Sequence, residues 1–216
     1  MEAGGVPPRE ADVAPAPVRP DPTAGRAAGL WTPADPGPLG LAGFAMTTFV
    51  LSMINANLVD AGGYGTVVAL AIAYGGLAQL LAGMWEFRTG NTFGAVAFTS
   101  YGAFWISFYV LLHTSTAVSS PHQVALYLFA WGGFTGYMFL ASLRTTGAIA
   151  LVFLLLTITF VLLGLGDIGS GHTGITHAGG YFGIATAAAA WYASFAAVIN
   201  STFGRVVAPV WPMRRV

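Results

Sequence analysis

The chain has 216 residues, of which 56% are hydrophobic and only 7% charged, and its mean hydropathy is +0.70. A water-soluble domain carries roughly 25% charged residues, so this composition excludes a protein surrounded by water and predicts a multi-pass protein of the cell membrane. The formal net charge is +0 and lysine is missing, which argues against a nucleic-acid partner. The lack of cysteine excludes disulfides, thiolate metal sites and cysteine nucleophiles.

Residues 1–34 differ in composition from the rest of the chain. Seven of the twelve prolines lie there, mixed with alanine, glycine and scattered charges. No apolar run follows Met1, so the segment does not have the pattern of a secretory signal. We expect a disordered tail over 1–34, with a docking segment as the alternative.

Six stretches are long and apolar enough to be membrane-spanning helices, since a span needs roughly 20 such residues. The sequence therefore predicts an all-α membrane domain over 35–209, followed by a short basic C-terminal tail over 210–216. The expected helices cover 38–58, 65–85, 92–112, 123–143, 147–165 and 175–202.

Charges are confined to the predicted connections and helix ends. Between residues 36 and 204 the charged residues are Asp60, Glu86, Arg88, Arg144 and Asp167. The arginines fall in the second and fourth connections and after the last helix, which places them on one side of the membrane. Because positive charge favours the cytoplasmic side, we predict that both termini are cytoplasmic. We expect Glu86 to form a surface or interfacial ion pair with Arg88.

Tryptophans and glycines within the predicted helices suggest close packing. Trp131 and Trp191 fall in mid-helix and are expected to pack between helices. Two glycine pairs have the small-xxx-small spacing that permits close helix crossings. These crossings fit packing inside one protomer and packing between protomers equally well. The pairs are Gly132 with Gly136 and Gly179 with Gly183.

The stretch 83–108 differs from a plain lipid-facing helix. It passes through a polar turn containing Glu86 and Asn91, and then continues with small, hydroxyl and aromatic residues in place of leucine and valine. Hydroxyl groups at membrane depth need partners or water, and small residues let helices approach each other. We therefore expect the third helix to face inward, beside something polar or wet.

The first predicted helix starts with Pro36 and Pro38, which a helix start tolerates because its first N–H groups have no intrahelical partner. Asp35 can cap this helix and lies favourably at the positive end of its dipole. A rigid helix start accounts for these residues, but not for Thr48 and Asn55 farther along the same apolar helix.

Residues 35–44, with the sequence DPGPLGLAGF, resemble the N-P-x-P-L-G-L-x-G-F signature of the acetate uptake transporter family, the succinate–acetate permeases. The resemblance continues through YGGLAQ at 74–79, GNTFG at 90–94 and AFTSYGAFW at 97–105, and covers about 35–209. The motif positions that we single out are Asp35, Pro36, Pro38, Gly40, Glu86, Asn91 and Thr92.

The resemblance implies a six-helix protomer that assembles into a homo-hexamer, with a separate path for acetate or another small carboxylate in each protomer. It also implies a hydrophobic constriction formed by Phe44, Tyr101 and Leu156. One position departs from the family pattern, because Asp35 stands where the family has asparagine. A carboxylate facing the path would repel an anion, whereas its capping role would be unaffected.

A short carboxylate has an apolar end and a charged end, and suits a path of apolar rings with a few neutral donors. Neutral donors hold an anion weakly enough for it to move on. Each could instead bond a neighbouring helix. No charged residue is predicted at mid-membrane, so proton-linked uptake would have the neutral acid carry the proton, the alternative being a passive anion channel. Besides Tyr101, the candidate polar residues are Thr48, Asn55, Gln79 and Ser100.

Other functions find less support in the sequence. Paired carboxylates and nucleophile–base pairs are missing from the predicted helices, so we do not expect an enzyme or a cofactor. Asp167, His172 and His177 form the one cluster that resembles a metal site, and a flexible glycine-rich loop is the preferred interpretation, with no metal expected. The sequence therefore favours a channel or transporter for acetate, with succinate as a further candidate substrate, over a non-transporting sensor or assembly protein.

Overall fold

The structure is a computed structural model that describes residues 31, 33–60, 64–114, 121–168 and 172–213. The chain divides into two units, Met1–Thr32 and Pro33–Val216, and the helices described here belong to the second. The disordered tail predicted for 1–34 lies almost entirely outside the described residues.

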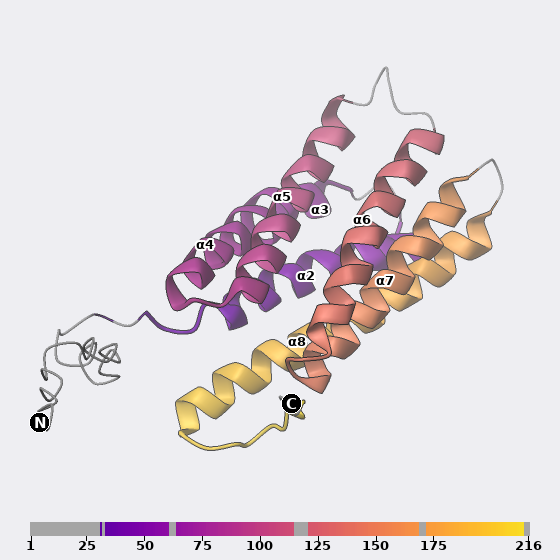
Figure 1. Cartoon of the computed structure of the whole chain (residues 1–216). Coiled ribbons are helices and arrows are strands. Elements are labelled where there is room, and N and C mark those ends of the chain that lie inside the picture. The colour runs from indigo at the N-terminus through magenta and orange to yellow at the C-terminus, as the bar shows by residue number, and fades with distance from the viewer. Residues whose placement is uncertain (1–30, 32, 61–63, 115–120, 169–171, 214–216) are drawn as a thin grey trace, which may run out of the picture. The chain divides into compact units, whose positions relative to one another are not determined.

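The second unit is built from α-helices (Figure 1). Two shorter helices, α3 and α4, are joined through a π-helical turn over Ala73–Ala78, so that Tyr64–Thr89 forms one continuous span. Within the described residues, six helices are then long and apolar enough to cross a membrane, as predicted. The largest boundary error is at the end of the second span, expected at residue 85 and observed at Thr89. The helices are α2 (Gly37–Asn55), α3 (Tyr64–Ile72), α4 (Gln79–Thr89), α5 (Thr92–Thr114), α6 (Pro121–Ser142), α7 (Gly147–Asp167) and α8 (Thr173–Phe203).

Local chemistry explains where several of these helices begin and end. Thr146 caps α7, because its Oγ1 accepts a hydrogen bond from the Ile149 N–H at 3.3 Å. Helices α4 and α8 end at Gly90 and Gly204, whose φ angles of 79° and 64° lie in the left-handed region that glycine adopts without strain.

Helix α7 lies between α6 and α8, α8 also packs along α2, and α4 packs on α5 (Figure 1). Glycines bring these helices close together. A Cβ added to Gly180 would collide with the backbone of Ala56, the C-cap of α2, and one added to Gly83 with Thr99 on α5. The two predicted glycine pairs also face neighbours in the same chain: Gly179 meets Leu163, and Gly132 meets Phe160. Of the two interpretations left open for these pairs, packing within the protomer therefore applies.

Candidate functional site

An aromatic cluster fills the middle of the helix bundle. Tyr101 on α5 is only 3% exposed, and its ring centre lies 5.6 Å from that of Phe44 on α2. The Tyr101 ring also packs against aromatic rings from α6 and α7, and Leu156 of α7 belongs to the same buried cluster. The three residues proposed for a constriction thus come together in one core. The aromatic partners of Tyr101 on α6 and α7 are Trp131, Phe134 and Phe153.

The Tyr101 hydroxyl has a partner that sequence reasoning missed. It lies 2.9 Å from Oγ1 of Thr135, a fully buried residue of α6. Thr135 stands among glycines and aromatic residues, and its sequence neighbours carry no signal that its hydroxyl faces α5. Trp131, expected to pack between helices, contacts Tyr101, and Trp191 packs likewise against Phe49 with ring centres 5.1 Å apart.

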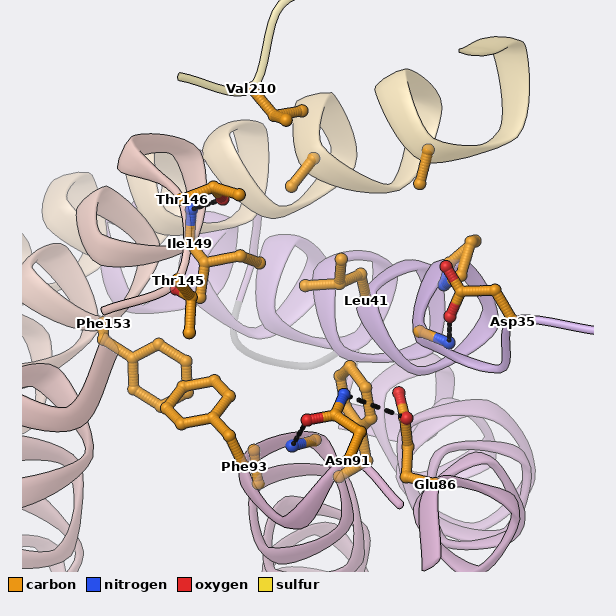
Figure 2. A pocket seen from close by; sticks show the side chains of 17 residues that line it. Asp35, Leu41, Glu86, Asn91, Phe93, Thr145, Thr146, Ile149, Phe153 and Val210 are labelled. Carbon is orange, nitrogen blue, oxygen red and sulfur yellow. Dashed lines mark hydrogen bonds between the residues drawn. The ribbon is translucent and has the colours of Figure 1, made fainter. Parts of the chain in front are cut away.

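A cavity of about 330 Å³, called here cavity 1, lies on one side of the aromatic cluster (Figure 2). The starts of α2, α5 and α7 and the end of α4 surround it. Most of its wall is apolar: the Phe93 and Phe153 rings, 5.2 Å apart, face it together with Leu41 and Ile149. Its polar groups come from Asp35, Glu86, Asn91, Thr145 and Thr146.

A second cavity of about 310 Å³, called cavity 2, lies among the opposite ends of the same helices. Leu51 and Asn55 of α2 line it, as do Phe104 and Phe108 of α5 and Tyr127 of α6. The Tyr127 hydroxyl lies 2.7 Å from Ser107 Oγ, which ties α6 to α5 at this level. Asp167 and Thr176 bring further polar atoms to its wall.

The two cavities lie on either side of the aromatic cluster along three helices. On α2, Leu41 lines cavity 1 and Leu51 lines cavity 2, with Phe44 between them. On α5 the order is Phe93, Tyr101, Phe104. On α7 it is Phe153, Leu156, Leu163. Each residue proposed for the constriction therefore falls between residues that line the two cavities.

The candidate polar residues occupy different positions. Asn55 lines cavity 2, whereas Thr48, Gln79 and Ser100 are not among the residues that line either cavity. Thr48 Oγ1 and Gln79 Oε1 are buried and have no hydrogen-bond partner in the described part of the chain. Thr48 follows Phe44 by one helical turn and precedes Asn55 by two, so all three lie on one face of α2.

The prediction of a surface ion pair between Glu86 and Arg88 is wrong. The Glu86 side chain is 2% exposed, and its Oε2 accepts hydrogen bonds from Asn91 Nδ2 at 3.0 Å and from Thr89 Oγ1 at 3.1 Å. Asn91 also caps α5, since its Oδ1 accepts from the Gly94 N–H at 3.1 Å. The Glu86 carboxylate in the turn between α4 and α5 is thus bonded to the neutral side chains of Thr89 and Asn91. Arg88 is exposed.

Asp35 lies one residue before the N-cap position of α2, and its Oδ1 accepts from the Gly37 N–H at 2.9 Å. This is the capping contact that we expected. The same side chain lines cavity 1 (Figure 2). The Asp35 carboxylate therefore faces the cavity, as it must if it is to repel an anion there.

A strap formed by residues 205–213 folds back over the start of α7. The carbonyls of Trp211 and Val210 accept from the N–H groups of Gly147 and Ala148, at 2.8 and 3.3 Å. Asn200 on α8 holds the strap through hydrogen bonds to the backbone of Val207 and Ala208. Val210 lines cavity 1, a role that the description of 210–216 as a basic tail did not anticipate.

The cluster considered as a metal site lies next to residues 169–171, which are outside the described part of the chain. Within the described ranges, no three His, Cys, Asp or Glu side chains gather as metal ligands would. Asp167 instead lines cavity 2, beside Thr176.

Comparison with known proteins gives consistent similarities. A family model described as the GPR1/FUN34/yaaH family matches residues 27–215. The chain is 44% identical over 195 residues to acetate permease A of Emericella nidulans, a match that covers 82% of this chain and 65% of the permease, slightly under two thirds of its length. It is 40% identical over 181 residues to the succinate-acetate/proton symporter SatP of Escherichia coli, covering 82% of this chain and 95% of the symporter. A solved structure of the bacterial acetate channel SatP has a TM-score of 0.77 at 39% identity, covering 83% of this chain and 99% of that one.

Proposed function

This chain belongs to the GPR1/FUN34/yaaH family, and on that premise we propose that it carries acetate and related small monocarboxylates across the cell membrane. The path runs from cavity 1 through the aromatic cluster to cavity 2 within a single protomer. The proposal is supported by relatives whose names state acetate or succinate–acetate transport. Succinate is the second substrate that these names suggest.

The observation that supports this path most directly is the order of residues along α2, α5 and α7. All three helices have a residue at cavity 1, a constriction residue and a residue at cavity 2 in that sequence. Phe44, Tyr101 and Leu156 then form the barrier between the cavities. A barrier of apolar side chains excludes water and hydrated ions, while small movements of the rings can admit a molecule of a few heavy atoms.

The polar groups near this barrier fit a carboxylate. Asn55 offers an amide at the wall of cavity 2. The buried Thr48 hydroxyl has no hydrogen-bond partner among the described residues, so it can donate to a passing carboxylate without breaking an existing bond. The unpartnered Gln79 Oε1 is an acceptor, so it suits the O–H of the neutral acid and not the carboxylate. We keep Ser100 as a candidate on the partly buried side of α5. Neutral groups of this kind allow weak binding at several points, which conduction requires.

The orientation proposed for the chain has both termini in the cytoplasm. Arg88 lies in the last turn of α4, and Arg144 and Arg205 follow α6 and α8; these are the helix ends nearest cavity 1. The positive-inside rule then assigns cavity 1 to the cytoplasmic side and cavity 2 to the outside. A multi-pass location in the plasma membrane follows, and the role is that of a carrier or channel and not of an enzyme.

We also propose a homo-hexamer, on the basis of the family resemblance. Large apolar side chains are exposed on the helices, as expected for surfaces that meet lipid or further copies. Since the path lies inside one protomer, assembly is expected to support the bundle and not to complete the path.

The proposal is tested by uptake of labelled acetate into proteoliposomes of the purified chain, with a membrane potential and a pH gradient imposed separately. Uptake driven by an interior-positive potential indicates anion passage, and uptake that follows only an inward proton gradient indicates electroneutral movement. Empty liposomes are subtracted, because neutral acetic acid crosses bilayers unaided. The transport proposal fails if the protein adds no flux under either gradient with acetate, succinate or lactate.

Matched variants test the path itself. Leu156→Ala opens the barrier and is expected to change flux or substrate size range, whereas Leu154→Ala, at an exposed position of the same helix, leaves both near native. Tyr101→Ala and the exposed Tyr181→Ala form a second pair with the same logic. Equal effects within each pair would contradict a path through the aromatic cluster.

A further inference from the structure

Cavity 1 is surrounded by the starts of three helices, α2, α5 and α7. A helix start carries about half a positive charge from its aligned peptide dipoles, which favours an anion nearby. Within the described wall of the cavity there is no arginine or histidine. Within the described wall, the helix starts are therefore the source of positive potential for an anion that enters here.

The caps of these helices differ in charge. Asn91 caps α5 and Thr146 caps α7, each through a neutral oxygen. At the start of α2 the acceptor is the carboxylate of Asp35, 2.9 Å from the Gly37 N–H. The side chain that caps α2 therefore carries a full negative charge, whereas the caps of α5 and α7 are neutral; the Glu86 carboxylate reaches the start of α5 only through its hydrogen bond from Asn91.

This charge does not act alone. A Cβ placed on Gly37 would lie 3.0 Å from Asp35 Oδ1 and 3.4 Å from Glu86 Oε1, so the two carboxylates face the same small volume (Figure 2). Glu86 is buried and accepts from Asn91 and Thr89, whereas Asp35 is exposed and accepts from one backbone N–H. Among the described residues that line cavity 1, these two are the ionisable ones.

We propose that Asp35 selects among substrates by their charge at cavity 1: it admits monocarboxylates and disfavours dicarboxylate dianions. The proposal rests on the transport function proposed above. A negative potential reduces the local concentration of a monoanion by some factor and that of a dianion by the square of this factor, because the interaction energy is proportional to charge. For one charge about 6 Å away in a water-like medium the factor is about threefold for a monoanion, and hence about tenfold for a dianion.

The test is Asp35→Asn, which removes the charge and keeps an oxygen that can accept from the Gly37 N–H. Uptake by purified protein in proteoliposomes is compared for acetate, for succinate as its dianion, and for monomethyl succinate, which has the length of succinate and a single charge. We expect the ratio of succinate to acetate flux to rise about threefold in the variant. The ratio of monomethyl succinate to acetate is expected to stay constant, since both are monoanions.

Asp60→Asn is the matched control. It removes the same charge from an exposed position in the connection after α2, where Asp60 lies with Asn57, Leu58 and Val59. Helix α2 has 19 residues, which at 1.5 Å per residue separates Asp60 from Asp35 by about 28 Å. That is well beyond the screening length of about 8 Å at physiological salt, so the flux ratios of this variant are expected to remain native.

The outcomes separate this proposal from the function on which it rests. If the native chain transports none of the three compounds, the proposed function fails. If the native chain transports acetate but Asp35→Asn leaves the succinate to acetate ratio unchanged, the role of Asp35 is overturned and the transport function stands. If the variant raises succinate and monomethyl succinate together, Asp35 acts through size and not charge, which also overturns the proposal.

Discussion

The hydroxyl of Tyr101 donates to Oγ1 of Thr135, 2.9 Å away, because the single proton of Thr135 is already donated to the Trp131 carbonyl at 2.7 Å. A tyrosine hydroxyl has one proton, so in this arrangement Tyr101 has none left for a carboxylate. On the proposed path, the ring of Tyr101, and not its hydroxyl, is then the part that we expect to meet the solute. Tyr101 was expected to act as a neutral donor, and this hydrogen bond favours a steric role instead.

The Tyr101–Thr135 pair predicts unequal effects of two conservative substitutions. Tyr101→Phe leaves Thr135 bonded to the Trp131 carbonyl, so we expect a loss of stability of about 1 kcal/mol. Thr135→Val leaves a buried tyrosine hydroxyl unpartnered and is expected to cost about 1 to 3 kcal/mol. The double variant should regain part of that loss. Denaturant unfolding of the four proteins in detergent measures these values, and equal single effects that add fully would contradict the proton assignment.

The buried Glu86–Asn91 pair predicts a rescue. Asn91→Asp keeps the cap of α5 but replaces the amide that donates to Glu86 with a second carboxylate, and we expect it to lower stability by about 2 kcal/mol. Glu86→Gln added to this variant restores an amide donor facing a carboxylate and should recover most of the loss. Thermal unfolding checks the prediction, with Asn57→Asp in an exposed turn as the control. Failure of the second substitution to recover stability would mean that Asn91 acts only as a cap.

The α2–α8 crossing predicts a steric effect of a single methyl group. A Cβ on Gly180 would collide with the backbone of Asn55 and Ala56, and backbone atoms cannot turn aside as a side chain can. We expect Gly180→Ala to cost about 2 to 3 kcal/mol. Gly133→Ala, which has open space around it, should be neutral or slightly stabilising, since alanine is the better helix former. Similar unfolding temperatures for the two variants would argue against this crossing.

The strap predicts a role for a single side chain at its base. Asn200 donates to the Ala208 carbonyl at 2.8 Å, and its Oδ1 accepts from the Val207 and Ala208 N–H groups. Asn200→Ala removes all of these bonds, and we expect a loss of about 2 kcal/mol together with faster proteolysis after residue 204. Thr202→Ala, which removes only a bond to the Val198 carbonyl within the same helix, is the control. Equal protease resistance in both variants would show that the strap is held by other contacts.

Much of the fold could be predicted because helix length and apolar composition determine which segments cross a bilayer. The observed spans begin within two residues of the expected positions, as with 92 and Thr92 or 175 and Thr173. The π-helical turn at Ala73–Ala78 was not foreseen, because Gly75 and Gly76 weaken a regular helix but do not specify a π-helical turn. Its formation depends on the fit between helices, where the Thr47 side chain lies against Gly75.

The site was predictable only in part. The motif resemblance brought Phe44, Tyr101 and Leu156 together, and the structure places them in one cluster. Thr135 and the strap could not be inferred, because each depends on the rotation of a helix about its axis or on a chain reversal that local sequence does not encode. The ion pair expected for Glu86 failed for a similar reason. Closeness in sequence favoured Arg88, whereas the left-handed turn at Gly90 brings Asn91 to the carboxylate instead.

The strap makes the start of α7 depend on residues that are synthesised later than the helix itself. Helix α7 can insert into the bilayer as soon as it has been made, but the first N–H groups of that helix obtain their partners only when Val210 and Trp211 arrive. Both residues follow α8 in the sequence, and a chain folds from its N-terminus as it emerges from the ribosome. The wall of cavity 1 is therefore completed only after α8 has been synthesised. A premature stop beyond α8 would yield a chain with every span in place and the wall still open on one side.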